Sequence, residues 1–206
     1  MLYIGIDVGT GSAKLLLINE NGEIKKSVIK KYPISFPRVG WAEQNPQDWW
    51  EQIYTGLQEL LAEGEADKVV GIGVAGQMHG LVALDCNDQV IRPAILWNDS
   101  RNQAEVDYLN CTIGKDKLTE YTANVAFAGF TAPKLLWMKK YESEKFSRIA
   151  KVMLPKDYIV YKLTGIHSCD PSDASGTLLY DVAHRCWSAP MLDICSMTRT
   201  QMPTLY

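Results

Sequence analysis

A glycine-bracketed segment, Ala75–Gly80, carries the polar side chains best suited to binding a ligand. It reads AGQMHG and follows directly on an apolar run, Val69–Val74, which predicts a buried strand. In α/β folds, ligands bind beyond the carboxyl ends of such strands. The two flanking glycines would allow the backbone to turn sharply and to approach a ligand closely. A strand that ends in a tight turn, with His79 satisfied by local hydrogen bonds, is the alternative.

A second candidate site follows the first predicted strand, Leu2–Val8. Asp7 near its end could hold Mg²⁺ through water, because this ion keeps much of its hydration shell. The turn that follows could present backbone N–H groups, two hydroxyls and the charge of Lys14 to a phosphate. Its residues are Gly9, Thr10, Gly11 and Ser12. A hairpin with glycines at positive φ and no ligand is the alternative.

Two better-known phosphate motifs are excluded at this turn. The pattern G-x-x-x-x-G-K-[ST] does not occur in the chain. The turn also leads into a second apolar run, Ala13–Ile18, rather than into a helix, which excludes the dinucleotide-binding G-x-G-x-x-G arrangement.

The elements that position the phosphate turn are predicted to be three strands of an antiparallel meander. The first two, Leu2–Val8 and Ala13–Ile18, flank the turn, and a hairpin signal at Asn19–Gly22 leads to the third, Glu23–Lys31. In the third strand, apolar residues interspersed with lysines suit a sheet with one face in water.

The rest of the chain alternates between helix and strand patterns. An Asn cap and a proline start a helix at Asn45–Pro46, which the apolar spacing continues to Ala62. Further strands are predicted at Leu81–Leu84 and Val90–Trp97, and further helices at Asp99–Leu109, Thr131–Tyr141 and Pro155–Leu163. This order predicts an α/β fold, with no domain boundary inside residues 1–206.

Composition excludes several classes of protein. The net charge of −3 and the pI near 5.6 argue against nucleic acid as the main partner. No apolar stretch approaches the ~18 residues that a membrane span needs. The five cysteines have no metal-type spacing, and no targeting segment opens the chain, so we expect a reduced, cytoplasmic protein.

The Asp-x-Gly-Thr turn between two strands resembles the phosphate-binding hairpin of the sugar kinase, Hsp70 and actin superfamily. Taken with AGQMHG, the chain resembles the N-terminal part of the FGGY family of sugar kinases, and within it the kinases that act on xylulose. Supporting stretches run from end to end of the chain: Gly40–Pro46, Pro93–Asp99, Gly129–Trp137, Leu154–Tyr158 and Ser172–Thr177.

The resemblance implies a fold and a reaction. The fold would be a ribonuclease-H-like α/β domain, a mixed sheet flanked by helices, facing a second, C-terminal domain that this chain lacks. The reaction would transfer the γ-phosphate of ATP, with Mg²⁺, to a small-molecule ketose, D-xylulose, giving D-xylulose 5-phosphate. A kinase for another ketose or polyol, such as ribulose, and a non-catalytic sugar-binding module on the same fold are the alternatives.

The resemblance also implies roles for single residues. Asp7 would lie near Mg²⁺ and the transferred phosphate, and the hairpin residues would line the phosphates. The ketose would contact Met78 and His79, where glycerol kinases carry an Arg-Glu pair, which argues against glycerol. Gln77, Trp97, Asn98, Asp99 and Phe130 complete the sugar side. For Trp97 a place in the core is the alternative, because a lone tryptophan after a strand usually packs inside.

One expected part of the family's machinery is missing from the sequence. The catalytic base of the family is an aspartate in a Gly-Gly-Asp segment, and none occurs before Tyr206. We therefore expect a truncated kinase that does not turn over alone. Apolar surface that would meet the second domain should promote self-association, for example as a homodimer.

Overall fold

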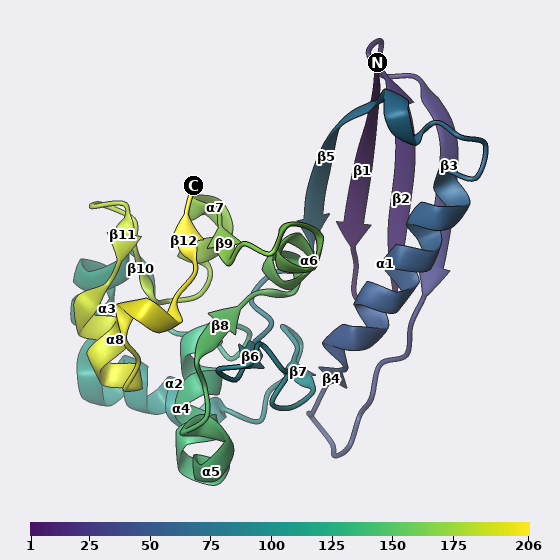
Figure 1. Ribbon diagram of the computed structural model, residues 1–206. Coiled ribbons are helices and arrows are strands. Elements are labelled where there is room, and N and C mark those ends of the chain that lie inside the picture. The colour runs from purple at the N-terminus through teal and green to yellow at the C-terminus, as the bar shows by residue number, and fades with distance from the viewer.

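A computed structural model describes all 206 residues, and its largest sheet is the predicted meander with one strand added. The meander consists of β1 (Leu2–Val8), β2 (Ser12–Asn19) and β3 (Ile24–Lys31), which pair antiparallel. β5 (Val69–Gly76) joins parallel to β1, so the order is β3-β2-β1-β5 and the sheet is mixed (Figure 1).

Helix α1 (Pro46–Leu60) covers one face of this sheet (Figure 1). It begins as its sequence predicts, because the Asn45 side chain accepts a hydrogen bond from the Gln47 amide at 3.2 Å and Pro46 occupies the first turn. Its apolar stripe faces β2 and β3, and Trp49 and Ile53 are fully buried there.

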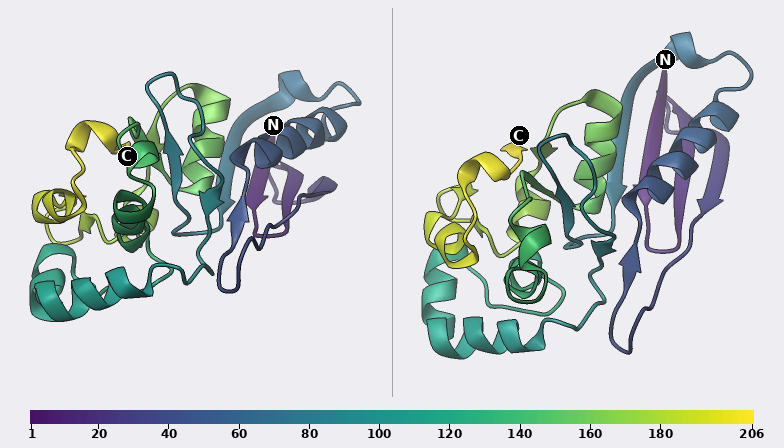
Figure 2. Two further views of the ribbon diagram at one scale, coloured as in Figure 1. Left: turned by 90° about the horizontal axis from the view of Figure 1, so that it is seen from below. Right: turned by 60° about the horizontal axis from the view of Figure 1, so that its bottom comes forward.

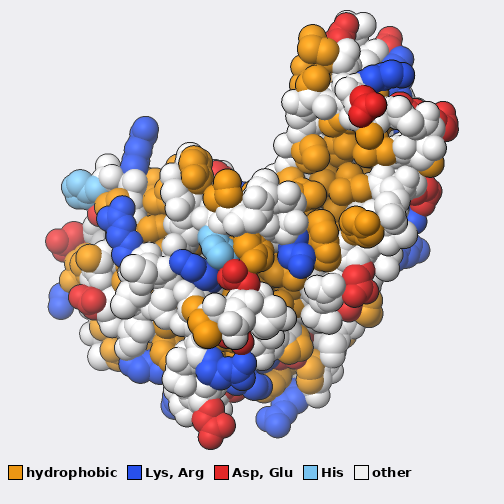
Figure 3. All heavy atoms as spheres, in the orientation of Figure 1, with side chains coloured by type: hydrophobic (Ala, Val, Ile, Leu, Met, Phe, Trp, Pro, Cys, Tyr) orange, Lys and Arg blue, Asp and Glu red, His pale blue; other side chains and the backbone are white.

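The prediction of a buried strand over Val69–Val74 is correct in its position but wrong in its burial. β5 is the edge of the sheet, and α1 packs over β2 and β3 at the opposite side. Val70 therefore keeps 56% of its surface exposed and Ile72 keeps 49%. Figure 3 shows hydrophobic side chains gathered over the part of the molecule that holds this sheet.

The remaining chain forms short strands and helices beside the sheet. The strands are β4 (Glu43–Gln44), β6 (Val82–Leu84), β7 (Ala94–Ile95), β8 (Lys151–Met153), β9 (Ser168–Cys169), β10 (Tyr180–Asp181), β11 (Cys186–Trp187) and β12 (Thr204–Leu205). The helices are α2 (Gln103–Asp107), α3 (Lys115–Thr122), α4 (Thr131–Tyr141), α5 (Ser143–Phe146), α6 (Pro155–Thr164), α7 (Pro171–Ser175) and α8 (Ala189–Cys195). Single turns occupy Ala66–Lys68 and Arg199–Gln201, and a π-helical turn occupies Tyr108–Gly114.

Two predicted elements are shorter or displaced. Only Ala94–Ile95 of the strand expected over Val90–Trp97 is formed, and Pro93 just before it cannot donate to a ladder. The helix expected from Asp99 starts at Gln103, because the Asp99 carboxylate is engaged by the Ala42 and Arg101 amides instead. The helices over Thr131–Tyr141 and from Pro155 are confirmed.

Two hydrophobic cores lie on opposite sides of a layer of short strands. The sheet core contains Ile6 and Trp49, whereas the helical core contains Leu135 and Met191. Alternate residues of β6 enter different cores: Val82 and Leu84 pack in the sheet core and Ala83 in the helical core. Figure 2 shows the two parts side by side, with β6 and β7 between them.

None of the helices combines the length and the apolar character needed to cross a membrane.

Candidate functional site

The two candidate segments leave the sheet side by side. β1 and β5 run parallel, with Asp7 beside Ala75 and Val8 beside Gly76, and the Gln77 amide donates to the Val8 carbonyl at 2.8 Å. The hairpin after β1 and the turn after β5 therefore emerge from the carboxyl ends of neighbouring strands, the position where α/β folds bind ligands.

The hairpin after β1 is closed by its own backbone and by Tyr32. The Gly9 amide donates to the Ser12 carbonyl at 3.0 Å, and the Tyr32 hydroxyl donates to the Gly9 carbonyl at 2.6 Å. The amides of Thr10 and Gly11 make no hydrogen bond within the chain, so they are free to face an anion. Neither hairpin glycine has a positive φ. A Cβ at Gly9 would lie 3.0 Å from the Ser12 carbonyl oxygen, so a larger residue there would crowd the hairpin backbone.

Asp7 and Lys14 are exposed cross-strand neighbours beside this hairpin. The two side chains form no ion pair within 4.0 Å, so both charges are open to a ligand. No group of three or more metal-ligating side chains occurs in the chain. A single free carboxylate beside free amides fits Mg²⁺ that is held mainly by water and phosphate oxygens, and it does not form a dedicated metal cage.

Gln44, which is 2% exposed, ties the hairpin to the turn after β5. Its amide nitrogen donates to the carbonyls of Thr10 at 2.7 Å and Pro33 at 3.1 Å. Its amide oxygen accepts from Gln77 and from the Trp49 indole, each at 3.0 Å. The side-chain amide of Gln77 therefore bonds to Gln44, the same side chain that bonds to the Thr10 carbonyl.

Trp97 lies in the site rather than in the core. Its side chain is 43% exposed, and its indole N–H donates to the Thr10 hydroxyl at 3.0 Å. Gly129 packs closely against the backbone of Trp97, because a Cβ at Gly129 would lie 2.8 Å from the Trp97 carbonyl oxygen. Asn98 follows Trp97 in the chain and is also exposed. The alternative of a core tryptophan is wrong.

His79 has the left-handed backbone conformation of its turn, with φ = 63°. Its ring lies 4.8 Å from that of Phe130, and Met78 beside it is 45% exposed. Burial, and then the Lys134 charge, hold the pKa of His79 below its ordinary value, so the imidazole is neutral at pH 7.

The glycines that flank this turn serve close packing rather than positive φ. A Cβ at Gly76 would lie 3.0 Å from the Val8 Cβ, and one at Gly80 would lie 2.8 Å from the Pro155 ring. The expectation that these glycines make the sharp turn is therefore wrong, since His79 itself has the unusual conformation.

The carboxylate of Asp99, like the side chain of Gln77, lies in the interior. It is 1% exposed, accepts from the Ala42 amide at 2.6 Å and pairs with the Arg101 guanidinium at 2.7 Å. The structure thus gathers Asp7, the hairpin, Gln77, His79, Trp97 and Phe130 near one edge of the sheet, whereas Asp99 supports the loop beneath it.

Four residues of the site were missed in the sequence: Tyr32, Gln44, Thr131 and Lys134. Thr131 and Lys134 donate to the His79 carbonyl at 3.1 and 3.0 Å. A signal for Lys134 was available, because it falls at helical spacing with Thr131, Leu135 and Met138 on the stripe that faces the core. Burial lowers the pKa of Lys134 to about 7, a shift that the charge of Asp99 partly opposes.

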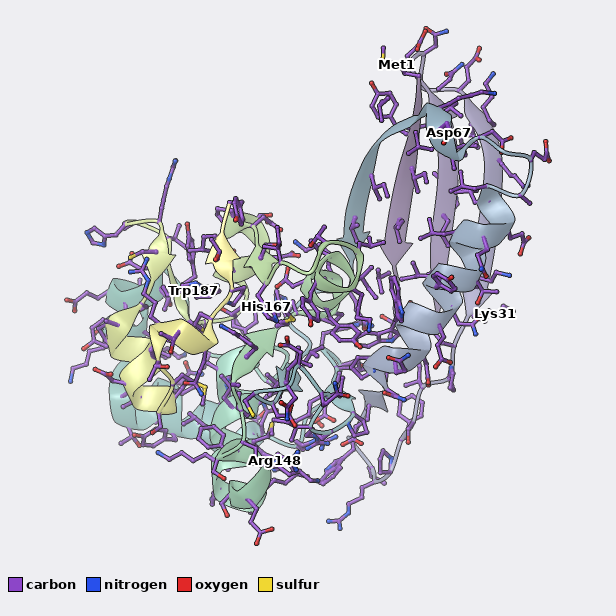
Figure 4. All side chains as sticks on the ribbon, in the orientation of Figure 1. Met1, Lys31, Asp67, Arg148, His167 and Trp187 are labelled. Carbon is purple, nitrogen blue, oxygen red and sulfur yellow. The ribbon has the colours of Figure 1, made fainter.

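Polar residues outside the site have structural partners. Asp170 caps α7 by accepting from the amides of Ser172 and Asp173, and both acids pair with Lys156. His167 bonds to Asp88 at 2.9 Å and stacks on Tyr161. Figure 4 shows His167 and Trp187 in the part of the molecule away from the large sheet.

Comparison with known proteins assigns the chain to a family. The sequence profile for the FGGY family of carbohydrate kinases, N-terminal domain, matches residues 2–206. The xylulose kinase of Escherichia coli (strain K12) is 44% identical over 205 residues, which cover 100% of this chain and 42% of that protein.

Solved structures share the fold. A crystal structure described as a xylulose kinase from Brucella ovis superposes with a TM-score of 0.95 at 40% identity, over 100% of this chain and 42% of that one. One described as a gluconate kinase from Lactobacillus acidophilus superposes with a TM-score of 0.94 at 29% identity, with the same coverage.

The chain therefore spans less than half the length of these relatives, and its fold is that of the sugar kinases of the actin and Hsp70 superfamily. The mixed sheet, the hairpin after β1 and the match over residues 2–206 agree. The chain belongs to the FGGY family of carbohydrate kinases.

Proposed function

We propose that this chain is the sugar-binding domain of a kinase that transfers the γ-phosphate of ATP to D-xylulose, giving D-xylulose 5-phosphate. The observation that carries the proposal is the joining of the phosphate hairpin to the sugar-facing turn. Gln44 bonds to both Thr10 and Gln77, and Trp97 bonds to the Thr10 hydroxyl. Phosphoryl transfer depends mainly on positioning and charge neutralisation, and this network would fix the two reactants relative to each other.

The residues divide into two groups by their chemistry. Asp7, Lys14 and the free amides of Thr10 and Gly11 offer a carboxylate, a cation and N–H donors, which suit Mg²⁺ and the phosphates of ATP. Bound Mg²⁺ would neutralise charge on the transferred phosphoryl group.

On the sugar side, His79 is a neutral imidazole beside Phe130 and exposed Met78. These groups suit an extended polyol that carries hydroxyls on an apolar chain. We assign the base that takes the proton of the attacking hydroxyl to a residue outside this chain, because in this proposal Asp7 would serve the metal and the phosphates.

Steady-state kinetics of the full-length kinase test this division. We expect His79→Ala to raise KM for D-xylulose about tenfold, with KM for ATP within about twofold. We expect Asp7→Ala to lower kcat about 100-fold with little change in sugar affinity, because it serves metal and phosphate. If the two variants changed the same parameters, the division would be wrong.

Calorimetric titration with D-xylulose, and with D-ribulose, gluconate and glycerol for comparison, tests the substrate. Ketoses that differ in one hydroxyl orientation are separated only by correctly placed hydrogen bonds. Tighter binding of D-ribulose or gluconate would replace the proposed substrate and leave the kinase assignment in place. Sugar binding without ATP consumption by the full-length protein would favour the non-catalytic module.

A further inference from the structure

We propose that Lys134 is a positioning residue that holds the His79 turn in its sugar-binding conformation. The inference rests on the proposed function, because it gives the turn's geometry a role in sugar binding. Lys134 itself touches neither reactant in this proposal and acts through the backbone of two loops.

Lys134 is unusual because it is a fully buried lysine whose amino group has no acid partner. Its side chain is 0% exposed, and no carboxylate lies within 4.0 Å of its ammonium group. Burying an ammonium group is costly unless its donors are satisfied. Lys134 instead donates to two backbone carbonyls, those of His79 at 3.0 Å and of Gly129. A leucine at this position would pack at less cost, so the donors are what the lysine supplies.

The first carbonyl belongs to the strained residue of the turn. A left-handed backbone conformation is uncommon for a residue with a Cβ and persists where its surroundings enforce it. At His79 the carbonyl accepts from both Lys134 and the Thr131 hydroxyl, at 3.0 and 3.1 Å. The Gly80 amide closes the same turn on the Met78 carbonyl at 2.7 Å. These bonds fix the direction in which the His79 side chain leaves the backbone.

The second carbonyl connects the same ammonium group to the neighbouring loop. Gly129 directly precedes Phe130, whose ring lies 4.8 Å from the His79 ring. Gly129 also packs against the Trp97 carbonyl. One buried amino group therefore fixes the spacing between the turn that carries His79 and the loop that carries Phe130.

A double-mutant cycle in the full-length kinase tests whether Lys134 acts through His79. Lys134→Met keeps most of the length and the apolar character of the side-chain stem but removes both hydrogen bonds. We expect it to raise KM for D-xylulose about tenfold and to leave KM for ATP within about twofold. In the His79→Ala background, the same substitution should raise the sugar KM less than about twofold further. Lys139→Met, at an exposed lysine on the same helix, is the control.

Thr131→Val supplies a milder second variant in case the methionine variant does not fold. It removes one of the two side-chain donors to the His79 carbonyl and nearly preserves the shape of the side chain. We expect about a threefold rise in sugar KM.

Nuclear magnetic resonance reports on the turn without any substrate. His79–Gly80 is the only His-Gly pair in this chain, so labelling the 206-residue chain with carbonyl-¹³C histidine and amide-¹⁵N glycine isolates its peptide group. We expect Lys134→Met and Thr131→Val each to shift this carbonyl signal, because each removes a hydrogen bond from it. Lys139→Met should leave the signal unchanged.

The outcomes separate this inference from the proposed function. An unchanged carbonyl signal in both variants, or a sugar KM effect that persists in full in the His79→Ala background, would overturn the positioning role. Equal changes in the KM values for sugar and ATP would do the same. A shifted signal in a protein that does not bind D-xylulose would support the fixed turn and overturn the proposed substrate.

Discussion

Replacing Gln44 with leucine should strongly destabilise this chain, because one buried amide serves four partners. Gln44→Leu preserves approximate volume and removes the donors to the Thr10 and Pro33 carbonyls. It also removes the acceptor of the Gln77 amide and the Trp49 indole. Trp49 is 0% exposed and Gln77 is 6% exposed, so water cannot readily replace the lost acceptor.

The expected magnitude follows from counting these groups. An unsatisfied buried donor costs about 1–3 kcal/mol, so the Trp49 and Gln77 groups together cost about 2–6 kcal/mol. The Thr10 and Pro33 carbonyls lie in loops, where water can compensate in part. The buried leucine side chain recovers about 1 kcal/mol through its added apolar surface. We therefore expect the free energy of unfolding to fall by about 1–5 kcal/mol.

Urea unfolding at pH 7, followed by far-ultraviolet circular dichroism, measures this change, with the slope m held comparable between variants. Gln58→Leu on the exposed face of α1 is the matched control and should change stability by less than about 0.5 kcal/mol. A loss below about 1 kcal/mol for Gln44→Leu, or one equal to the control, would refute the reasoning that this amide is the buried connection between hairpin and turn.

Two further perturbations probe the hairpin and a buried acid. Trp97→Phe removes the indole donor to the Thr10 hydroxyl. In the full-length kinase we expect KM for ATP to rise about fivefold and KM for the sugar to rise less. Equal changes in the two KM values would contradict this. Burial raises the pKa of Asp157 from 3.8 to about 6, so the folded protein binds the carboxyl proton more tightly than the unfolded chain does. The stabilisation from this bound proton is fully present below about pH 4 and is lost as the pH rises through 6. Urea unfolding should therefore find the stability of the wild type relative to Asp157→Asn falling by about 2–3 kcal/mol between pH 4 and pH 7, and a constant difference would rule out the shift.

Local sequence patterns predicted the elements that are stabilised locally. The meander was readable because its turns and apolar runs are short-range features. The start of α1 was readable from Asn45 and Pro46, which act on the backbone next to them. The hairpin and the Gln-Met-His segment were found for the same reason, as contiguous stretches of unusual residue types.

What the sequence did not reveal depends on residues far apart in the chain. Gln44 lies 33 residues before Gln77, and Lys134 lies 55 residues after His79. No sequence pattern connects Gln44 with Gln77 or Lys134 with His79. The exposure of β5 was missed because an apolar run does not say whether another strand or helix covers it. The burial of Asp99 was missed because Ala42, whose amide donates to its carboxylate, lies 57 residues away in the sequence.

The layer of short strands between the two cores has a consequence for how the chain unfolds. Val82 and Ala83 are neighbours in sequence, yet each is anchored in a different core. Disrupting either core would displace β6 and expose residues that pack in the other core. Cooperativity arises where one structural unit cannot open without loosening the next. We therefore expect the two halves of the chain to unfold together in a single transition.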